Sequence, residues 1–356
     1  MTRSFTKMRK WFVMGILFLN MSYLQAQDVD FSQFFTNPTY FNPAFVGLTV
    51  GMKVRFNYLK QWTGLSGNYH AFDFSADIAD RNIPGAGGLG IIATSDQQGF
   101  GTLKTSVIGL IPAVRVPIND ISVVQFGALI SLVSRQVDWN NLVFADQLDP
   151  RLGNIGPSSF PNPGATPVVF PDFSLGGIYQ IKTGNVVGTF GIAAHHVTQP
   201  DQSFLENVAP LPRKWVAHMD FVIDFERHRG FYARARSFKL NPGILFQTQA
   251  KMRLLAFGAN AYMQNVYAGI WYQNEVFNTN SLSNIVWMAG MNVPFTNETR
   301  MKVIYSFIMN LSGNISLPGP SHQVSLIFEL DNVSLINPYR LRRQARSRSG
   351  VECSPF

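Results

Sequence analysis

VGMKVRFNY, residues 50–58, alternates apolar and polar side chains at every second position. A period of two is typical of a β-strand with one apolar face and one polar face. The same alternation returns in FDFSADI (72–78), MDFVIDFE (219–226), MKVIYSFIM (301–309) and VSLIFEL (324–330). These segments are close in length to the nine to eleven residues with which a tilted strand crosses a bilayer.

Segments of this kind recur along the whole chain and predict fourteen strands. We expect them near residues 50–59, 69–78, 87–97, 103–116, 121–137, 172–182, 185–197, 213–226, 240–248, 252–261, 265–273, 284–293, 299–310 and 321–330. An even number of such strands predicts an all-β fold, an outer-membrane antiparallel up-and-down β-barrel. Apolar side chains would then face lipid, and their charged neighbours would line the lumen.

The composition supports a barrel in a membrane. Hydrophobic residues make up 46% and charged residues 14%, against about 25% charged in an ordinary soluble domain. A soluble β-sandwich or propeller would share the alternation, but no repeat of blade length is present. Several aromatic residues could form girdles at the two membrane surfaces: Tyr58, Trp62, Tyr69, Trp139, Tyr179, Trp215, Tyr232, Tyr267, Trp271, Tyr272 and Tyr305.

The two ends of the chain differ from its body. Residues 1–26 have the basic start, apolar run and small residues of a secretory signal peptide. Residues 27–49 form a segment before the first strand, 50–330 the transmembrane barrel, and 331–356 a basic tail that is either a periplasmic contact or a disordered end. The first 26 residues carry +4 and the tail +3, which leaves +1 of the total +8 for the rest. A nucleic-acid surface is therefore excluded.

The connections suggest an orientation. Tight turns marked by Pro, Gly or Asn are expected at 116–120, 182–185, 263–265 and 294–297, as in the periplasmic turns of outer-membrane barrels. The longest connection, 138–171, reads as an outer loop that meets a partner. The connection 227–239 is longer and more basic than an inner turn should be.

No group of residues in the sequence has the spacing of a catalytic, cofactor-binding or metal-binding site. Asp73 and Asp77 share a strand face but lie about 13 Å apart, too far for a paired-carboxylate catalyst. We expect them, like Asp220 and Asp224, to lie in the lumen, where their charges would be balanced by Lys53, Arg55, Arg115 and Lys302. His195 and His196 are adjacent, so in a strand they point to opposite faces. The sequence therefore predicts a protein that is not an enzyme.

The residues after the leader resemble a known family. The segment QDVDFSQFFTNPTYFNPAFVG, 27–47, and the segment QWTGL, 61–65, are similar to the N-terminal signature of PorP/SprF proteins of the type IX secretion system of Bacteroidetes. Ser66-Gly67-Asn68 departs from the family pattern. The motif residues are candidates for docking partners: Phe31, Ser32, Gln33, Asn37, Pro38, Asn42, Pro43, Ala44, Gly47, Gln61, Trp62 and Gly64.

The resemblance implies a function. A member of this family would help to export, receive or hold large secreted surface proteins and adhesins, with a link to gliding motility. Its partners would be outer-membrane lipid, secretion-system components, periplasmic cell-wall-associated proteins, and cargo at the outer loop 138–171. The alternative is a diffusion porin or small-solute transporter, which shares every feature except the N-terminal signature.

Two arrangements of the segment 27–49 remain open. Each Asn-Pro pair interrupts regular structure, because Pro lacks an N–H and pushes the preceding residue to an extended conformation. We therefore expect an extended segment punctuated by turns. It either acts as a plug or rim-docking arm, anchored by its aromatic residues, or merely caps the lower mouth of the barrel.

Overall fold

The computed structural model describes most of the chain between residues 31 and 333. The described residues are 31, 34–49, 51–65, 67, 69–79, 86–99, 103–149, 151–154, 156–160, 166–205, 207–225, 238–275, 283–296, 298–311, 319–331 and 333. The predicted leader, most of the basic tail, and residues 227–237 of the basic connection lie outside this set.

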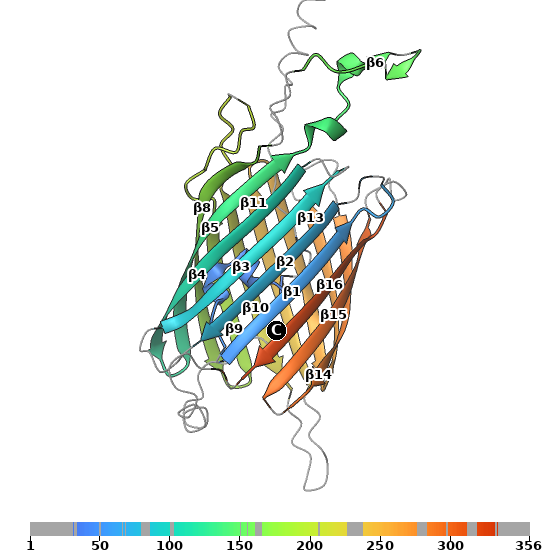
Figure 1. The fold of residues 1–356 in the computed structure, drawn as a ribbon. Coiled ribbons are helices and arrows are strands. Elements are labelled where there is room, and N and C mark those ends of the chain that lie inside the picture. Colours follow the sequence, from blue (N-terminus) through green and yellow to red (C-terminus); the bar gives the residue numbers. More distant parts are fainter. Residues whose placement is uncertain are drawn as a thin grey trace, which may run out of the picture.

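Fourteen long strands form one closed sheet. Their bounds are β1 (Gly51–Gln61), β2 (Tyr69–Ala79), β3 (Ala86–Gln98), β4 (Leu103–Asn119), β5 (Ser122–Val137), β8 (Val168–Thr183), β9 (Val186–His195), β10 (Lys214–Asp224), β11 (Phe238–Gln249), β12 (Met252–Met263), β13 (Val266–Glu275), β14 (Ser283–Pro294), β15 (Thr299–Asn310) and β16 (Ser321–Leu330). The strands tilt across the wall of the barrel (Figure 1).

Each strand pairs antiparallel with its neighbour in sequence, and the last strand returns to the first. Met52 pairs with Leu330 and Lys60 with His322, so β1 and β16 close the wall. Closure leaves no strand edge with unpaired backbone groups. The predicted fourteen-stranded up-and-down barrel is confirmed, with strand ends within a few residues of the expected positions.

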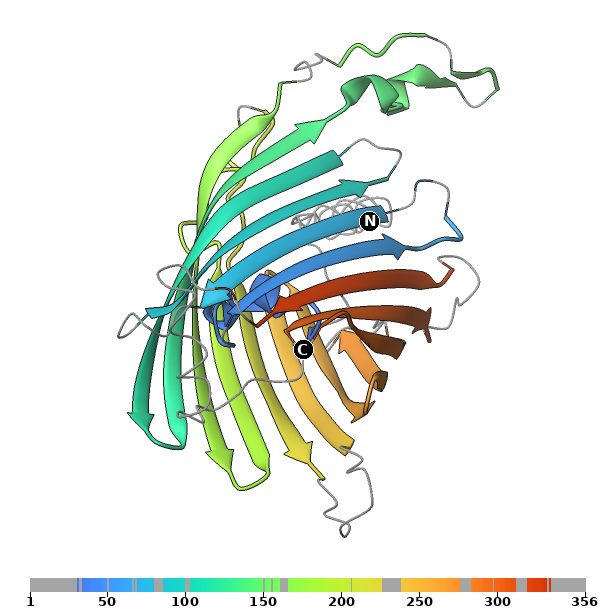
Figure 2. The ribbon, with the colours of Figure 1, turned by 60° about the horizontal axis from the view of Figure 1, so that its bottom comes forward.

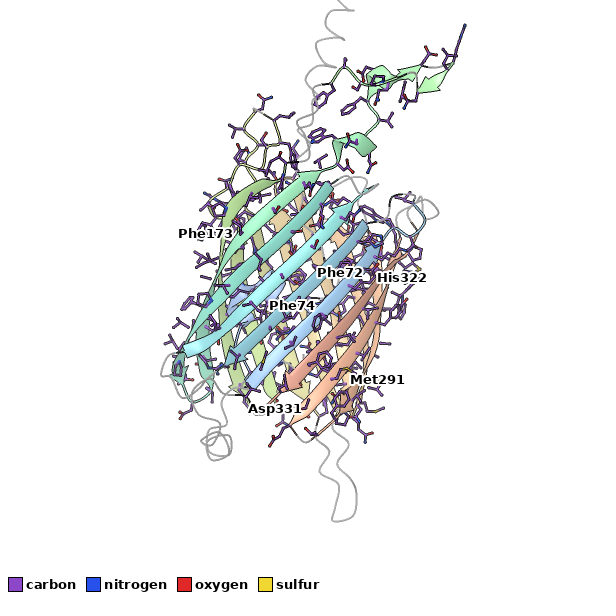
Figure 3. All side chains as sticks on the ribbon, in the orientation of Figure 1. Phe72, Phe74, Phe173, Met291, His322 and Asp331 are labelled. Atoms are coloured by element: carbon purple, nitrogen blue, oxygen red, sulfur yellow. The ribbon has the colours of Figure 1, made fainter. Side chains whose placement is uncertain are left out.

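The two faces of the wall have the predicted character. Phe72, Phe173 and Met291 lie on the outer surface (Figure 3), with 59%, 39% and 56% of their area exposed. Lys53 and Asp73, by contrast, are buried on the lumen side. No helix among the described residues is long and apolar enough to cross a membrane.

The predicted aromatic girdles are partly wrong. Tyr69, Tyr267 and Trp271 are buried in the interior cluster instead of facing outward. Tyr58 and Tyr305 do lie outside, where each hydroxyl group contacts a histidine, His70 at 2.9 Å and His322 at 2.7 Å. Alternation alone could not reveal this, because large aromatic side chains also fill the lumen.

The two ends of the barrel differ. At the turn end, Asp120-Ile121, Gly184-Asn185 and Gln264-Asn265 join adjacent strands directly. At the loop end, the long outer loop follows β5 and projects from the barrel (Figure 1). This loop contains η2 (Trp139–Asn141), η3 (Ala145–Gln147) and a small hairpin of β6 (Leu148–Asp149) and β7 (Gly153–Asn154).

Candidate functional site

The segment before β1 lies inside the barrel. Its two short helical elements, α2 (Pro38–Phe41) and η1 (Pro43–Phe45), are enclosed by the ring of strands (Figure 2). Almost every described side chain from 34 to 48 is buried. We call residues 34–48 the plug. The plug arrangement, rather than a cap on the rim, is therefore the one that the structure has.

The conformation of the plug differs from the extended one that we expected. Each Asn-Pro pair starts a single helical turn, because proline at the first helical position needs no N–H partner there and its φ suits the turn. Asn37 precedes α2, and Asn42 caps η1 by accepting a hydrogen bond from the N–H of Ala44 at 3.0 Å. The turns punctuate the segment as predicted, but they are helical.

Asn42 connects the plug to the wall. Its amide nitrogen lies 3.2 Å from the carbonyl oxygen of Gly177 on β8 and 3.2 Å from that of Ile192 on β9. It also lies 3.1 Å from Nε2 of His218 on β10. One fully buried amide thus bridges three neighbouring strands.

Two glycines make this close approach possible. A Cβ atom on Gly176 would lie 2.0 Å from Oδ1 of Asn42, and one on Gly127 would lie 2.4 Å from the carbonyl oxygen of Pro43. Such distances are far shorter than any non-bonded contact allows. The wall of β5 and β8 therefore has glycine where the Asn-Pro turn lies against it.

Further hydrogen bonds fix the plug along its length. Gln125 on β5 donates to the carbonyl oxygen of Val46 at 2.6 Å. Nε2 of His195 lies 3.0 Å from the carbonyl oxygen of Phe41. Gly47, whose φ of +66° suits glycine, donates its N–H to Asp77 at 2.9 Å. Asp77 in turn forms a buried ion pair with Arg55.

Aromatic rings fill the other side of the plug. The ring centroid of His218 lies 4.8 Å from that of Phe34 and 5.0 Å from that of Phe45. The ring of Phe35 lies 5.0 Å from Trp271 on β13. Aromatic pairs at these distances add to the stabilisation from burial. The aromatic residues thus anchor the segment, as the sequence suggested, but within the lumen.

Among the lumen charges, Arg55 pairs with Asp77 as predicted, and other charged residues have partners that were not predicted. Lys53 and Lys302 both contact Glu329, at 3.1 and 2.7 Å. Asp73 accepts a hydrogen bond from Asn57, and Asp220 one from Asn241. Arg115 donates to the carbonyl oxygen of Leu48 at 3.4 Å, so it also holds the plug.

The predicted motif residues do not form one site. Phe31, Asn37, Pro38, Asn42, Pro43, Ala44 and Gly47 lie in the lumen, whereas Ser32 and Gln33 lie outside the described residues. Gln61 is the last residue of β1, and Trp62 and Gly64 follow it at the loop end. There Thr63 donates its N–H to the carbonyl oxygen of Pro320 at 3.2 Å. The second motif therefore joins the β1–β2 and β15–β16 loops.

The outer loop has internal order in its described parts. Asp146 accepts hydrogen bonds from the N–H of Ser159 at 2.7 Å and from the hydroxyl groups of Ser158 and Ser159. These bonds lower the pKa of Asp146 below its ordinary value. The ring of Phe160 stacks between Trp139 and Phe144, with centroid distances of 5.7 and 4.8 Å.

The sequence matches one family model, that of the type IX secretion system membrane protein PorP/SprF, over residues 24–328. The chain belongs to this family. The match includes the plug and nearly the whole barrel. As a PorP/SprF protein with a closed barrel and an apolar exterior, the chain is a membrane component of type IX secretion, and its architecture is that of the outer membrane. Among curated proteins, nothing matches the sequence.

Solved barrels are similar in fold to this PorP/SprF protein at low identity. A Pseudomonas aeruginosa FadL homologue is 13% identical with a TM-score of 0.45, covering 83% of this chain and 94% of its own. The Pseudomonas putida toluene transporter TodX is 11% identical with a TM-score of 0.39, covering 83% and 93%. An outer membrane channel from Pseudomonas putida F1 is 10% identical with a TM-score of 0.38, covering 85% and 99%.

Sequence reasoning missed the wall residues that hold the plug. Gly127, Gly176 and His218 lie on three different strands, far apart in sequence, and none belongs to a recognisable motif. A weak signal was present, because glycine in a strand interior often marks a close approach of another backbone. Which backbone approaches can be read only from the fold.

Proposed function

We propose that this PorP/SprF protein serves type IX secretion as a plugged, non-enzymatic barrel. It assists the export, reception or surface attachment of large secreted proteins and adhesins, including those used for gliding. The turn end would face periplasmic, cell-wall-associated parts of the machine, and the loop end would face the cargo. The plug carries this proposal, because residues 34–48 occupy the lumen that a diffusion porin needs open.

The strength of the plug's attachment argues against the porin alternative. Backbone or side-chain atoms of the plug bond to strands β2, β4, β5, β8 and β9. A buried polar group that loses its partner costs roughly 1–3 kcal/mol, so releasing the plug would be costly. The described family-motif residues Asn37, Pro38, Asn42, Pro43, Ala44 and Gly47 thus act first as parts of the plug.

The outer loop supports a role in partner binding. Val143, Leu148 and Leu152 are 59%, 56% and 78% exposed, although Asp146 and the Trp139–Phe160 stack give the loop a defined shape. Apolar side chains presented on an ordered loop are typical of a binding surface. On this basis we propose that the cargo contacts this loop, which was predicted at 138–171 and ends where β8 begins at Val168.

Liposome swelling with the purified barrel tests the plug. We expect the wild type to exclude small sugars, and a variant that lacks residues 31–48 to admit them. A broad solute leak through the wild type would support the porin and refute the plugged barrel.

Affinity isolation from native membranes tests the secretion role. Wild-type protein should bring down secretion-system components together with a large secreted protein. A Leu148→Ser, Leu152→Ser variant should lose the secreted protein and keep the machine components. If only lipopolysaccharide and general porins were isolated, the secretion role would be wrong.

A further inference from the structure

Three side chains that can carry positive charge lie next to one another on the outer face of the wall, near the loop end. Lys60 on β1 lies opposite His70 on β2 and opposite His322 on β16. The alternation of exposure along each strand places all three outside, and Figure 3 shows His322 in the loop-end half of the wall. Neighbouring strands are about 4.8 Å apart, so the three backbone positions span about 10 Å. We call His70, Lys60 and His322 the basic row.

A tyrosine hydroxyl group holds each histidine of the basic row. The hydroxyl group of Tyr58 lies 2.9 Å from Nδ1 of His70, and that of Tyr305 lies 2.7 Å from Nδ1 of His322. The two rings of each pair are also stacked. A hydroxyl group that donates to Nδ1 leaves the ring proton on Nε2. Each histidine then has an N–H donor at Nε2, one on either side of Lys60.

The neighbours of the basic row along the sheet are uncharged or basic. Beyond His322, strand β15 carries Phe307. Beyond His70, strand β3 carries Gln97, and β4 then carries Lys104. Among the residues that the structure describes, no carboxylate pairs with any member of the row. A cation without a counter-charge, flanked by N–H donors, is a surface for an anion.

The wall becomes apolar directly below the basic row. The next outward positions hold Tyr58, Phe72, Val324 and Tyr305, and those after them Phe56, Phe74 and Leu326. Strand β1 has 11 residues, close to the roughly nine to eleven with which a tilted strand crosses the hydrocarbon layer. Lys60 is the last residue but one of this strand. The basic row therefore lies where the hydrocarbon ends and the lipid head groups begin.

The described histidines outside the basic row face the lumen. His218 contacts Asn42 of the plug, and His195 and His196 line the same cavity within the barrel. The prediction that His195 and His196 point to opposite faces is wrong, because β9 ends at His195 and His196 has a φ of +54°. In the described part of the chain, outward-facing histidines thus occur only on the two sides of Lys60.

We propose that the basic row binds the phosphate group of a lipid in the membrane leaflet around the loop end. Lys60 supplies the positive charge, and Nε2 of His70 and of His322 donates to phosphate oxygens, which accept strong hydrogen bonds. The acyl chains lie on the apolar positions below the row, which a soluble anion would leave uncovered. The lipid bridges β2, β1 and β16, so it also joins the first strand of the barrel to the last. This binding is additional to the secretion role.

Native mass spectrometry of the whole barrel, released from a neutral detergent, tests the proposal without any mutation. The probes are phosphatidylglycerol, phosphatidylcholine and diacylglycerol with identical acyl chains, and inorganic phosphate is the competitor. Phosphatidylglycerol should bind about tenfold more tightly than phosphatidylcholine, whose choline group offsets the phosphate charge. Diacylglycerol should bind more weakly still, and inorganic phosphate in excess should not displace phosphatidylglycerol.

Two results with the wild type would overturn the proposal. Equal affinity for phosphatidylglycerol and phosphatidylcholine would show that the charge of the head group is not recognised. Displacement of phosphatidylglycerol by inorganic phosphate would make the row a site for a free anion instead of a lipid.

A triple variant, Lys60→Gln with His70→Gln and His322→Gln, locates the binding. Its affinity for phosphatidylglycerol should fall roughly tenfold or more, as expected for the loss of hydrogen bonds to a charged group. Binding of diacylglycerol should be unchanged, which checks that the wall is intact. Lys251→Gln is the control, because Lys251 is an exposed lysine at the loop end, in the turn between β11 and β12. The proposal fails if the triple variant binds phosphatidylglycerol as well as this control does.

A double variant, Tyr58→Phe with Tyr305→Phe, tests the orientation of the histidines. It keeps every charge of the basic row and both aromatic rings, and removes only the hydroxyl groups that hold Nδ1. Its affinity for phosphatidylglycerol should lie between those of the wild type and the triple variant. Wild-type affinity in the double variant would refute the part of the proposal in which the tyrosines position the histidines.

Discussion

Oδ1 of Asn42 occupies the position where Gly176 would carry a side chain, since a Cβ atom there would lie only 2.0 Å away. The amide nitrogen of the same asparagine lies 3.2 Å from the carbonyl oxygen of the next residue, Gly177. The plug and strand β8 therefore fit each other at the level of single atoms. Neither could change at this point without displacing the other.

Substituting Gly176→Ala should displace the plug. Overpacking a buried site costs about 1–3 kcal/mol, and the clash here is with a buried amide that cannot move freely. We expect a lower midpoint of thermal unfolding in detergent, together with a measurable single-channel conductance in planar bilayers.

Gly177→Ala is the matched control for this substitution. A Cβ atom on Gly177 would meet the ring of Phe126 at 3.5 Å, an ordinary contact on the outer face. This variant should unfold like the wild type and remain closed. Equal behaviour of the two alanine variants would argue against a plug held by close packing.

Asn42→Ala tests the hydrogen bonds of the plug separately from its packing. The substitution removes the contacts with Gly177, Ile192 and His218 and the cap on Ala44. Leaving such buried groups unpaired costs roughly 1–3 kcal/mol. Hydrogen exchange followed by mass spectrometry should show faster exchange across residues 38–48.

Asn154→Ala provides the comparison for Asn42→Ala. Asn154 is exposed in the outer loop, and its side chain accepts one hydrogen bond from Gly156 at 3.2 Å. Exchange in the plug should be unchanged in this variant. The hydrogen-bonding role of Asn42 would be refuted if residues 38–48 exchanged at the wild-type rate in Asn42→Ala.

The order of the outer loop should depend on pH. Hydrogen bonds from Ser159 and Ser158 lower the pKa of Asp146, and those from Arg151 and Leu152 lower the pKa of Asp149. A carboxylate with a lowered pKa stabilises the loop above its ordinary pKa, near 3.8. This stabilisation is lost as the pH falls through the lower value of the folded loop.

Fluorescence of Trp139 in a background without the other tryptophans measures this transition, because its ring stacks on Phe160. We expect a change in emission below pH 4 that Asp146→Asn reduces. Asp138→Asn serves as the control, since Asp138 accepts hydrogen bonds from Asn140 and Asn141 of the adjacent η2. An unaltered acid transition in Asp146→Asn would show that Asp146 does not order the loop.

Much of the fold could be predicted because a barrel strand obeys a local rule. In β1, Phe56 must face outward and Arg55 inward, so a period of two appears in the sequence itself. This alternation predicted the number of strands and their approximate ends. It failed for Trp271, which is buried against Phe35, because an aromatic residue on the inner face looks like one on the outer face.

The sites depend on contacts that the sequence does not encode locally. Asn42 was identified through its motif, but its partners Gly177, Ile192 and His218 belong to strands more than 130 residues away. Gly176 and His218 meet this asparagine only because β8, β9 and β10 are neighbours in the barrel wall. A prediction of these sites needs the order and register of the strands.

The closure between β15, β16 and β1 offers a test of the lumen charges. The carboxylate of Glu329 contacts Lys53 and Lys302 at 3.1 and 2.7 Å, and all three side chains are almost fully buried. Glu329→Gln would leave two buried cations without their counter-charge. We expect a loss of roughly 3 kcal/mol, since removing one partner of a buried ion pair is strongly destabilising.

Urea unfolding of the barrel in lipid vesicles measures this loss, with Asp331→Asn as the control. Asp331 contacts Arg300 at 2.7 Å, but both side chains are more than 40% exposed at the turn end. An exposed pair contributes about 0.5 kcal/mol, so the control should unfold close to wild type. If Glu329→Gln were no less stable than Asp331→Asn, water in the lumen would be screening these charges. The closure between β15, β16 and β1 would then be held by backbone hydrogen bonds and apolar contacts alone.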